Sequence, residues 1–414
     1  MNEGLAMVLA QRVVHGLAVL GSALVYSANG YAGCDGDPLA CEGYAFEAVY
    51  TGEIWGNAAG GMRRGAAYLD NLDLMLEIDA ERAWGWTGAT FFAYVLANTD
   101  DTLSEDIVGD AQVVSNIDAI GAVRLFEFWY EQALWDERFS IKTGLYNLNS
   151  EFDANETGSL FINSSHGIGA DFSQAGENGP SIFPVTSLAL RTRLALTQTL
   201  SLQAVVLDGV PGDPDDPRRT AIILSKSEGA LIAVEADYLD DRGTKLALGF
   251  WHFTARFDDV LATDSAGDPV QRSGNQGVYV LAERVLYREP ESPEQGLAVF
   301  GRFGIADDDV NQFDRYLGVG GVYTGLVPGR DEDRLGLAVA IADNGDPFEE
   351  AQRLAGESVD SREINVELTY RLQVTPWLAL QPDIQYVADP GAAGGLGDAW
   401  VFGLRFEASY SLPK

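Results

Sequence analysis

The sequence predicts an all-β protein, a transmembrane antiparallel β-barrel of 16 strands, and three observations support this. Apolar side chains alternate with polar or small ones along many segments, which is the period of a strand with one apolar and one wet face. These segments have the length, roughly 9–11 residues or a little more, that a tilted strand needs to cross a bilayer. The connections between them alternate between short and long, as periplasmic turns and outer loops do in such barrels.

The alternation is clearest in the last segment, residues 399–412. Its even positions from Trp400 to Leu412 are apolar, and its odd positions from Gly403 onward, including Arg405 and Glu407, are polar or small. The same alternation along the chain predicts strands at 44–55, 66–79, 88–98, 121–131, 139–148, 186–195, 200–208, 228–238, 244–256, 277–288, 295–305, 316–326, 334–343, 363–372, 376–387 and 399–412.

The connections supply independent support for the barrel. Those at 135–138, 240–243 and 373–375 are short, whereas those at 99–120, 149–185, 209–227, 257–276 and 344–362 are long. If the first strand starts in the periplasm, 149–185 is the third outer loop, and we expect it to fold inward and narrow the pore. A soluble β-sandwich would also alternate apolar and polar residues, but it has no reason to alternate its loop lengths so regularly.

The amino terminus predicts export. An apolar stretch at 17–25 follows Arg12 and precedes small residues, so we interpret 1–32 as a signal peptide, 33–43 as a cysteine-bounded segment and 44–414 as the barrel. Cys34 and Cys41 are close together, and in an exported protein such a pair predicts a disulfide. Lipidation of Cys34, or two free thiols, are the alternatives.

The charge balance restricts the partners. Sixty-two Asp and Glu stand against 27 Lys and Arg, for a net charge of −35, which argues against a nucleic-acid backbone as partner. Much of the acid falls in predicted outer loops, where it is either solvated or bridged by divalent cations to lipid headgroups. The sequence contains no Gly-x-Ser-x-Gly elbow, dinucleotide fingerprint or zinc-ligand spacing, so we expect no enzyme, cofactor or metal.

Several segments together resemble a known family. They include Leu125-Phe126-Glu127-Phe128-Trp129-Tyr130-Glu131-Gln132, Asp208-Gly209-Val210-Pro211-Gly212, Tyr323-Thr324-Gly325-Leu326-Val327-Pro328-Gly329-Arg330 and Pro382-Asp383-Ile384-Gln385-Tyr386-Val387. In order and spacing, the chain from about Tyr50 onward resembles the carbohydrate-selective porins of Gram-negative outer membranes, the OprB-like group. The resemblance implies a barrel that passes mono- or oligosaccharides down a gradient, surrounded by outer-membrane lipid and lipopolysaccharide, as a monomer or a homotrimer. A general or ion-selective porin, a structural anchor and a barrel enzyme are the alternatives.

Strand parity predicts which side chains face the lumen. Between 125 and 131 the even positions, among them Phe126, are expected to face lipid, which leaves Glu127, Trp129 and Glu131 inside. An Arg that faces lipid costs roughly 2–4 kcal/mol at the bilayer midplane, so arginines on strands are also placed inside. The candidate sugar contacts are Glu127, Trp129, Glu131, Arg191, Arg193, Trp251, Arg302 and Gln385, with Asn147 and Glu151 at the entrance of the third outer loop.

Two kinds of contact are expected from these residues. Inward indoles offer faces on which the apolar faces of sugars stack, and Arg and acidic groups offer several charge-assisted hydrogen bonds. We expect the three arginines to face acidic partners among Glu127, Glu131 and Glu283. The alternative role is structural, because Arg and Glu on adjacent strands also pair across a barrel wall simply to balance charge.

Overall fold

A computed structural model describes residues 42–412 of the chain. The predicted signal peptide and the predicted Cys34–Cys41 disulfide lie outside these residues. In the described part, no helix is both long enough and apolar enough to cross a membrane.

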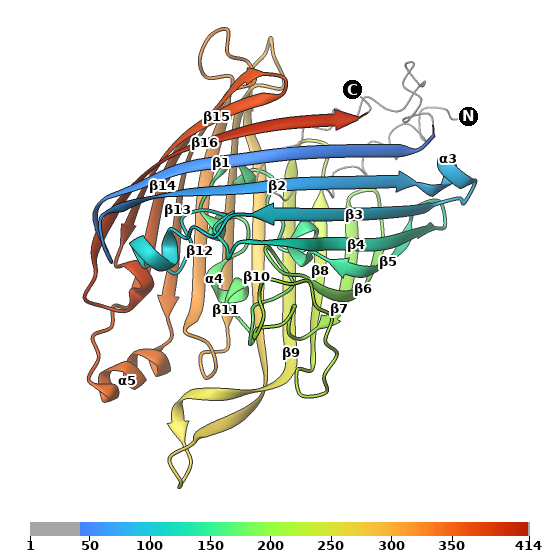
Figure 1. Ribbon diagram of the computed structural model, residues 1–414. Coiled ribbons are helices and arrows are strands. Elements are labelled where there is room, and N and C mark those ends of the chain that lie inside the picture. The colour runs from blue at the N-terminus through green and yellow to red at the C-terminus, as the bar shows by residue number, and fades with distance from the viewer. Residues whose placement is uncertain (1–41, 413–414) are drawn as a thin grey trace.

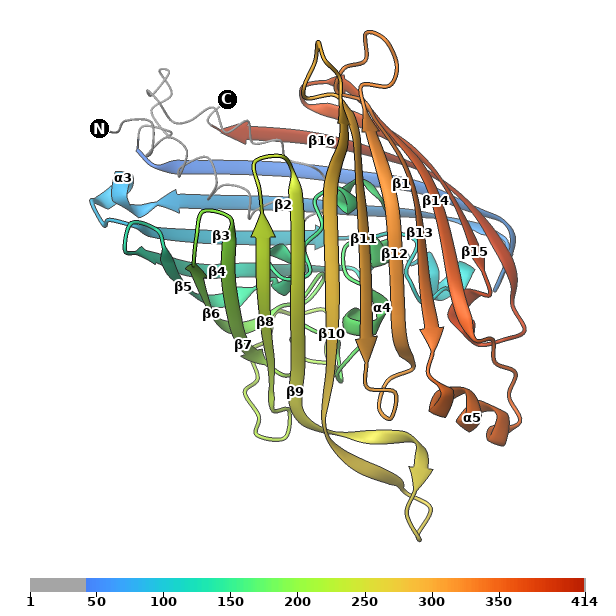
Figure 2. The same cartoon turned by 180° about the vertical axis from the view of Figure 1, so that it is seen from behind.

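Sixteen antiparallel strands form one closed barrel in which each strand pairs with the next and the first pairs with the last (Figures 1 and 2). The strands are β1 (Tyr44–Gly61), β2 (Gly65–Asp79), β3 (Ala89–Asn98), β4 (Ala122–Leu134), β5 (Phe139–Tyr146), β6 (Ser187–Ala195), β7 (Leu200–Asp208), β8 (Ala230–Leu239), β9 (Thr244–Thr263), β10 (Pro269–Arg288), β11 (Gly296–Ala306), β12 (Phe313–Thr324), β13 (Arg334–Asn344), β14 (Arg362–Thr375), β15 (Leu378–Ala388) and β16 (Gly397–Leu412). This confirms the predicted fold class and strand number.

Helices occur only in the connections of the described chain. They are α3 (Ala80–Trp84), α4 (Ala170–Ser173) and α5 (Asp346–Ala355), with single 3-10 turns at Leu148–Ser150, Gly158–Leu160, Ser164–His166 and Pro390–Ala392 and one π turn at Ser104–Val108. The longest connections are 99–121, 147–186 and 209–229. They leave the barrel at the end opposite to both termini or fold inside it (Figures 1 and 2).

The barrel wall is apolar outside and polar inside, as the alternation predicts. Leu248, Leu337 and Leu404 are exposed on its outer face, whereas charged side chains such as Glu235 and Arg405 are buried within. This is the reverse of a water-soluble protein and fits a wall that faces lipid.

The connection predicted at 257–276 is mostly strand. β9 and β10 continue pairing beyond the barrel, with Asp258 opposite Gln271 and Arg256 opposite Ser273, so that only 264–268 remains a turn. The hairpin projects from the outer rim toward α5 (Figures 1 and 2). The prediction failed because this ribbon has no lipid face and therefore no apolar alternation, although its backbone still pairs.

Phe126 is a second correction. Its side chain is buried in the barrel and does not face lipid, and its ring contacts those of Tyr94 and Phe183. The cause is a β-bulge: Tyr94 pairs with Glu127 and Val95 with Leu125, so Phe126 has no partner and the parity of β4 changes there.

Two glycines make room for inward indoles. Gly277 is paired with Trp251 and Gly403 with Trp55, and a Cβ at either glycine would come within 2.4 Å and 2.3 Å of the indole ring. Each indole therefore lies across the glycine of its neighbouring strand. The two indoles cover the lumen-facing side of the wall at these positions with aromatic surface.

Candidate functional site

The connection between β5 and β6, residues 147–186, folds into the barrel as predicted, and we call it the third loop (Figure 1). Its backbone amides need hydrogen-bond acceptors there, and carboxylates of the wall supply them. Glu235 accepts from Asp153 N at 2.9 Å, Glu283 accepts from Thr157 N at 2.6 Å, and Glu367 accepts from Ile162 N and Asn163 N at 2.6 and 3.0 Å. The third loop is thus fixed to β8, β10 and β14.

The connection between β3 and β4, residues 99–121, enters the lumen as well, and we call it the second loop. Glu363 of β14 accepts from Ala111 N at 2.8 Å and from Gln112 N at 2.9 Å. Ile107 and Val114 of this loop pack with Trp55 in a buried apolar cluster. Two loops therefore narrow the pore, and wall carboxylates hold both.

The first charge cluster lies where the third loop begins. Arg191 contacts Glu151 through Nε at 2.6 Å and Glu131 through Nη2 at 2.9 Å, and Lys142 Nζ lies 2.7 Å from Glu151. Burial disfavours the charged form of Glu151, but Lys142 and Arg191 outweigh it and hold its pKa below the ordinary value. Lys142 also lies 3.9 Å from the centroid of the Trp129 ring, a cation–π contact.

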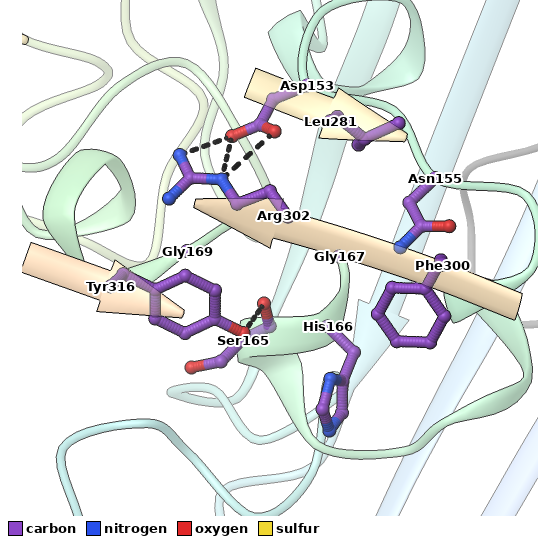
Figure 3. A pocket seen from close by; sticks show the side chains of 10 residues that line it. All are labelled: Asp153, Asn155, Ser165, His166, Gly167, Gly169, Leu281, Phe300, Arg302 and Tyr316. Atoms are coloured by element: carbon purple, nitrogen blue, oxygen red, sulfur yellow. Dashed lines mark hydrogen bonds and ion pairs between the residues drawn. The ribbon is translucent and has the colours of Figure 1, made fainter. Parts of the chain in front are cut away.

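The second charge cluster surrounds Arg302 of β11. Its guanidinium lies 2.7 Å from Asp153 Oδ2 (Figure 3). It also pairs with Asp171, and both carboxylates belong to the third loop. Tyr279 and Tyr316 lie beside the guanidinium at 5.3 and 5.2 Å. An Arg with two carboxylates and two aromatic faces is compensated in the low-dielectric interior, so this cluster clamps the loop to the wall.

A small cavity adjoins Arg302 and contains His166 in its lining. The cavity holds about 10 Å³, room for roughly one water molecule. His166 is buried between Phe161 and Phe300, and neither ring nitrogen has a hydrogen-bond partner in the described chain. Figure 3 shows His166 and Phe300. Burial lowers the pKa of His166 to about 3, so the imidazole is neutral.

The two predicted indoles are both covered. Trp251 is fully buried and stacks on Phe172 of the third loop. Trp129 has Phe92 stacked at 5.1 Å, and its Nε1 donates to Glu127 at 3.1 Å. Their predicted sugar contact stays a prediction, and it requires the covering side chains to move.

The remaining predicted residues divide into loop supports and one arginine that has no ion-pair partner among residues 42–412. Glu127 accepts from Asn147 N at 3.1 Å, and Gln385 donates to Val114 O at 2.9 Å, so these residues hold the two loops. Arg193 is half-buried and forms no ion pair with any residue between 42 and 412, although its charge acts on the carboxylate of Asp237. Of the expected partners, Glu131 does pair with Arg191, whereas Arg302 binds Asp153 and Asp171 and not Glu283, because the third loop intervenes.

Sequence reasoning missed Lys142, Asp153, Asp171 and Phe172. The alternation along 139–148 places Lys142 on the lumen side, so parity and the cost of a lipid-facing cation could have found it. The other three lie in a loop without periodicity, and only the loop's own fold brings them to the wall.

Residues 63–410 match the family model described as carbohydrate-selective porin, OprB family. The chain belongs to this family. It is 26% identical over 406 residues to Porin B of Pseudomonas aeruginosa, covering 89% of this chain and 88% of the relative. It is 22% identical to the putative porin QuiX of Acinetobacter baylyi, covering 89% and 90%.

Solved structures show the same fold. The high-pH structure of Pseudomonas putida OprB matches with a TM-score of 0.79 at 24% identity, covering 90% of this chain and 95% of that one. The outer-membrane channel DcaP of Acinetobacter baumannii matches with a TM-score of 0.54 at 11% identity, covering 89% and 98%. This OprB-family chain is a carbohydrate porin of the Gram-negative outer membrane.

Proposed function

We propose that this porin passes neutral mono- or oligosaccharides by diffusion through the space that the second and third loops leave open, and that it catalyses no reaction. The observation that carries this is the pairing of opposite charges inside the lumen. Lys142 and Arg191 are matched by Glu131 and Glu151, and Arg302 is matched by aspartates. A neutral hydroxylated solute meets many hydrogen-bonding groups there, and the cations among them already have carboxylate partners.

Arg193 and Glu131 are the predicted residues best suited to touch a passing sugar. Arg193 is half-buried without an ion pair among the described residues, and the Glu131 side chain keeps 23% of its surface exposed although it pairs with Arg191. Such contacts need to be weak, because a solute that binds tightly does not leave. Saturation in the millimolar range, about −4 kcal/mol of binding free energy, is the expectation.

Arg193→Ala tests this assignment in a liposome-swelling series with glucose, a disaccharide and a neutral amino acid. The expected result is sugar flux lowered about 2–5-fold, the loss of one or two modest hydrogen bonds, with amino-acid flux changed less. Arg242→Ala, at the exposed turn before β9, is the matched control. Equal loss for sugar and amino acid would instead support a general porin without a sugar site.

We further propose that the monomer is the functional unit; the pairing of β1 with β16 closes a complete barrel, so no second chain is needed to form the pore. Native mass spectrometry of the detergent-extracted protein distinguishes a monomer from a homotrimer. A trimer that survives dilution would overturn this part of the proposal.

A further inference from the structure

The outer half of β4 has lost its strand neighbour. β4 pairs with β5 only from Phe128, opposite Leu145, to Leu134, so 122–127 have no β5 partner. This gap follows from the third loop, because the chain leaves the wall after Tyr146 to enter the lumen. Something other than β5 must satisfy the free edge of β4.

The connection between β7 and β8, residues 209–229, covers that edge. Leu125 N–H donates to the Thr220 hydroxyl at 2.8 Å, and Arg124 donates to Pro217 O at 2.8 Å. Arg218 donates to Gly121 O at 2.8 Å. The segment 220–229 then runs from β4 to the start of β8, and we call it the strap.

A groove of about 410 Å³ lies between the strap and the outer face of the wall. Leu188 of β6 and Val206 of β7 line it from the wall, and Leu224 of the strap lines it from the other side. Val206 shares its face of the wall with the exposed Leu202, so the groove continues the lipid-facing surface of the barrel.

The strap itself is unusually apolar for an outer connection. Ile222, Ile223 and Leu224 are consecutive and all exposed, Leu224 by 71%. Exposed apolar runs of this kind mark a surface that something covers. Since the groove opens onto the lipid-facing surface near the outer rim, an acyl chain of the outer leaflet is the occupant that its position and chemistry fit.

Polar groups close the rim of the groove. Lys226 lines it and forms no ion pair with another described residue. Asp208 also lines it, and the charge of Glu228 on the strap acts on Asp208. A lysine ammonium is a compact charge suited to a phosphate. A ligand with a phosphate beside its acyl chains would therefore match both the apolar lining and Lys226.

We propose that the groove between the strap and β6–β8 binds lipopolysaccharide, with an acyl chain against Leu188, Val206 and Leu224 and a lipid A phosphate at Lys226. Lipopolysaccharide is the occupant because the groove opens at the outer end of the barrel, where that lipid forms the leaflet. The site lies on the opposite face of the wall from the lumen, so its occupancy and the sugar flux are separable.

Native mass spectrometry of the full protein tests this, after exchange into nanodiscs that contain equal amounts of rough lipopolysaccharide and phosphatidylglycerol. The wild-type protein should retain one lipopolysaccharide on gentle release. Leu224→Ser and Lys226→Glu should each lower that occupancy at least 5-fold, with sugar flux unchanged. Leu354→Ser, an exposed leucine of α5, and Arg242→Glu, at the turn before β9, are the matched controls and should retain it.

Equal occupancy in both groove variants and the wild type would overturn the site. Equal retention of phosphatidylglycerol would also overturn the proposal, because the groove would then hold any acyl chain. Each variant is first checked for the heat-shifted band of a folded barrel. Both substitutions lie in an exposed connection, and either variant alone suffices for the comparison.

Discussion

The indole of Trp251 and the ring of Phe172 lie flat against each other, with their centroids 4.8 Å apart and their planes within 1°. Trp251 belongs to β9 and Phe172 to α4 in the third loop, so this pair joins the wall to the loop that narrows the pore. Phe172 also stacks on Tyr279 of the next strand. Aromatic packing thus complements the carboxylate–amide hydrogen bonds that hold the loop.

Phe172→Ala should loosen the third loop. Removing a buried Phe costs about 3–5 kcal/mol of unfolding free energy, and the freed space should raise single-channel conductance. Urea unfolding in micelles and planar-bilayer recordings measure the two effects. Phe250→Ala is the control. Phe250 lies next to Trp251 on β9 but faces lipid, so this substitution should leave conductance unchanged. A variant with lowered stability and unaltered conductance would show that this stack does not position the loop.

Glu151→Gln should destabilise the entrance of the third loop. The carboxylate is the shared partner of Lys142 and Arg191, and neutralising it leaves two buried cations undercompensated. Breaking one side of a buried ion pair costs about 3–5 kcal/mol, and urea unfolding measures it. Glu156→Gln, an exposed glutamate of the same loop, should change stability by less than about 0.5 kcal/mol. Similar losses in both variants would contradict the role given to Glu151.

His166 should make stability fall in acid. Burial lowers its pKa to about 3 in the folded protein, against about 6.5 in the unfolded chain. Between these values only the unfolded state takes up the proton, so stability is full above pH ~6.5 and declines below it by about 1.4 kcal/mol per pH unit. From pH 6.5 to pH 5 the loss is about 2 kcal/mol.

His166→Leu isolates this contribution, since it keeps an apolar side chain between Phe161 and Phe300 and removes the titration. Its unfolding free energy should fall about 2 kcal/mol less than that of the wild type over the same pH interval. The same urea series at both pH values measures it. Parallel pH curves for the two proteins would mean that the imidazole is not kept neutral in the folded state.

Periodicity could predict the wall but not what fills it. Lipid on one side forces alternation, so parity placed Arg191, Arg302 and Gln385 inside. Parity failed at Phe126, because a bulge adds one residue without any signal in the apolar pattern. The partners of Arg302 are Asp153 and Asp171. Both lie in the third loop, whose path cannot be predicted from a periodic pattern.

The same limit applies to the candidate sugar contacts. The sequence placed Trp129 and Trp251 in the lumen, but it could not show that Phe92 and Phe172 cover them. Glu127, which was expected to bind sugar, accepts a backbone N–H group, as do Glu283 and Glu367 of the wall, because inward loops bring unpaired amides with them. The alternation of residues along a strand does not show which loop amides will need a hydrogen-bond acceptor.

Gly277→Ala is the sharpest test of the link between wall and loop. A Cβ there would lie 2.4 Å from the Trp251 ring and 2.7 Å from Ile305 O, so the indole must move and its stack on Phe172 must loosen. Overpacking of this kind costs about 1–3 kcal/mol, and we expect altered conductance with it. Gly301→Ala is the matched control, because its nearest atom would be 3.8 Å away on a neighbouring strand of the same barrel. It should leave stability and conductance close to those of the wild type. If the two substitutions changed stability and conductance equally, the cause would be the lost flexibility of a strand glycine and not the displacement of the Trp251 indole.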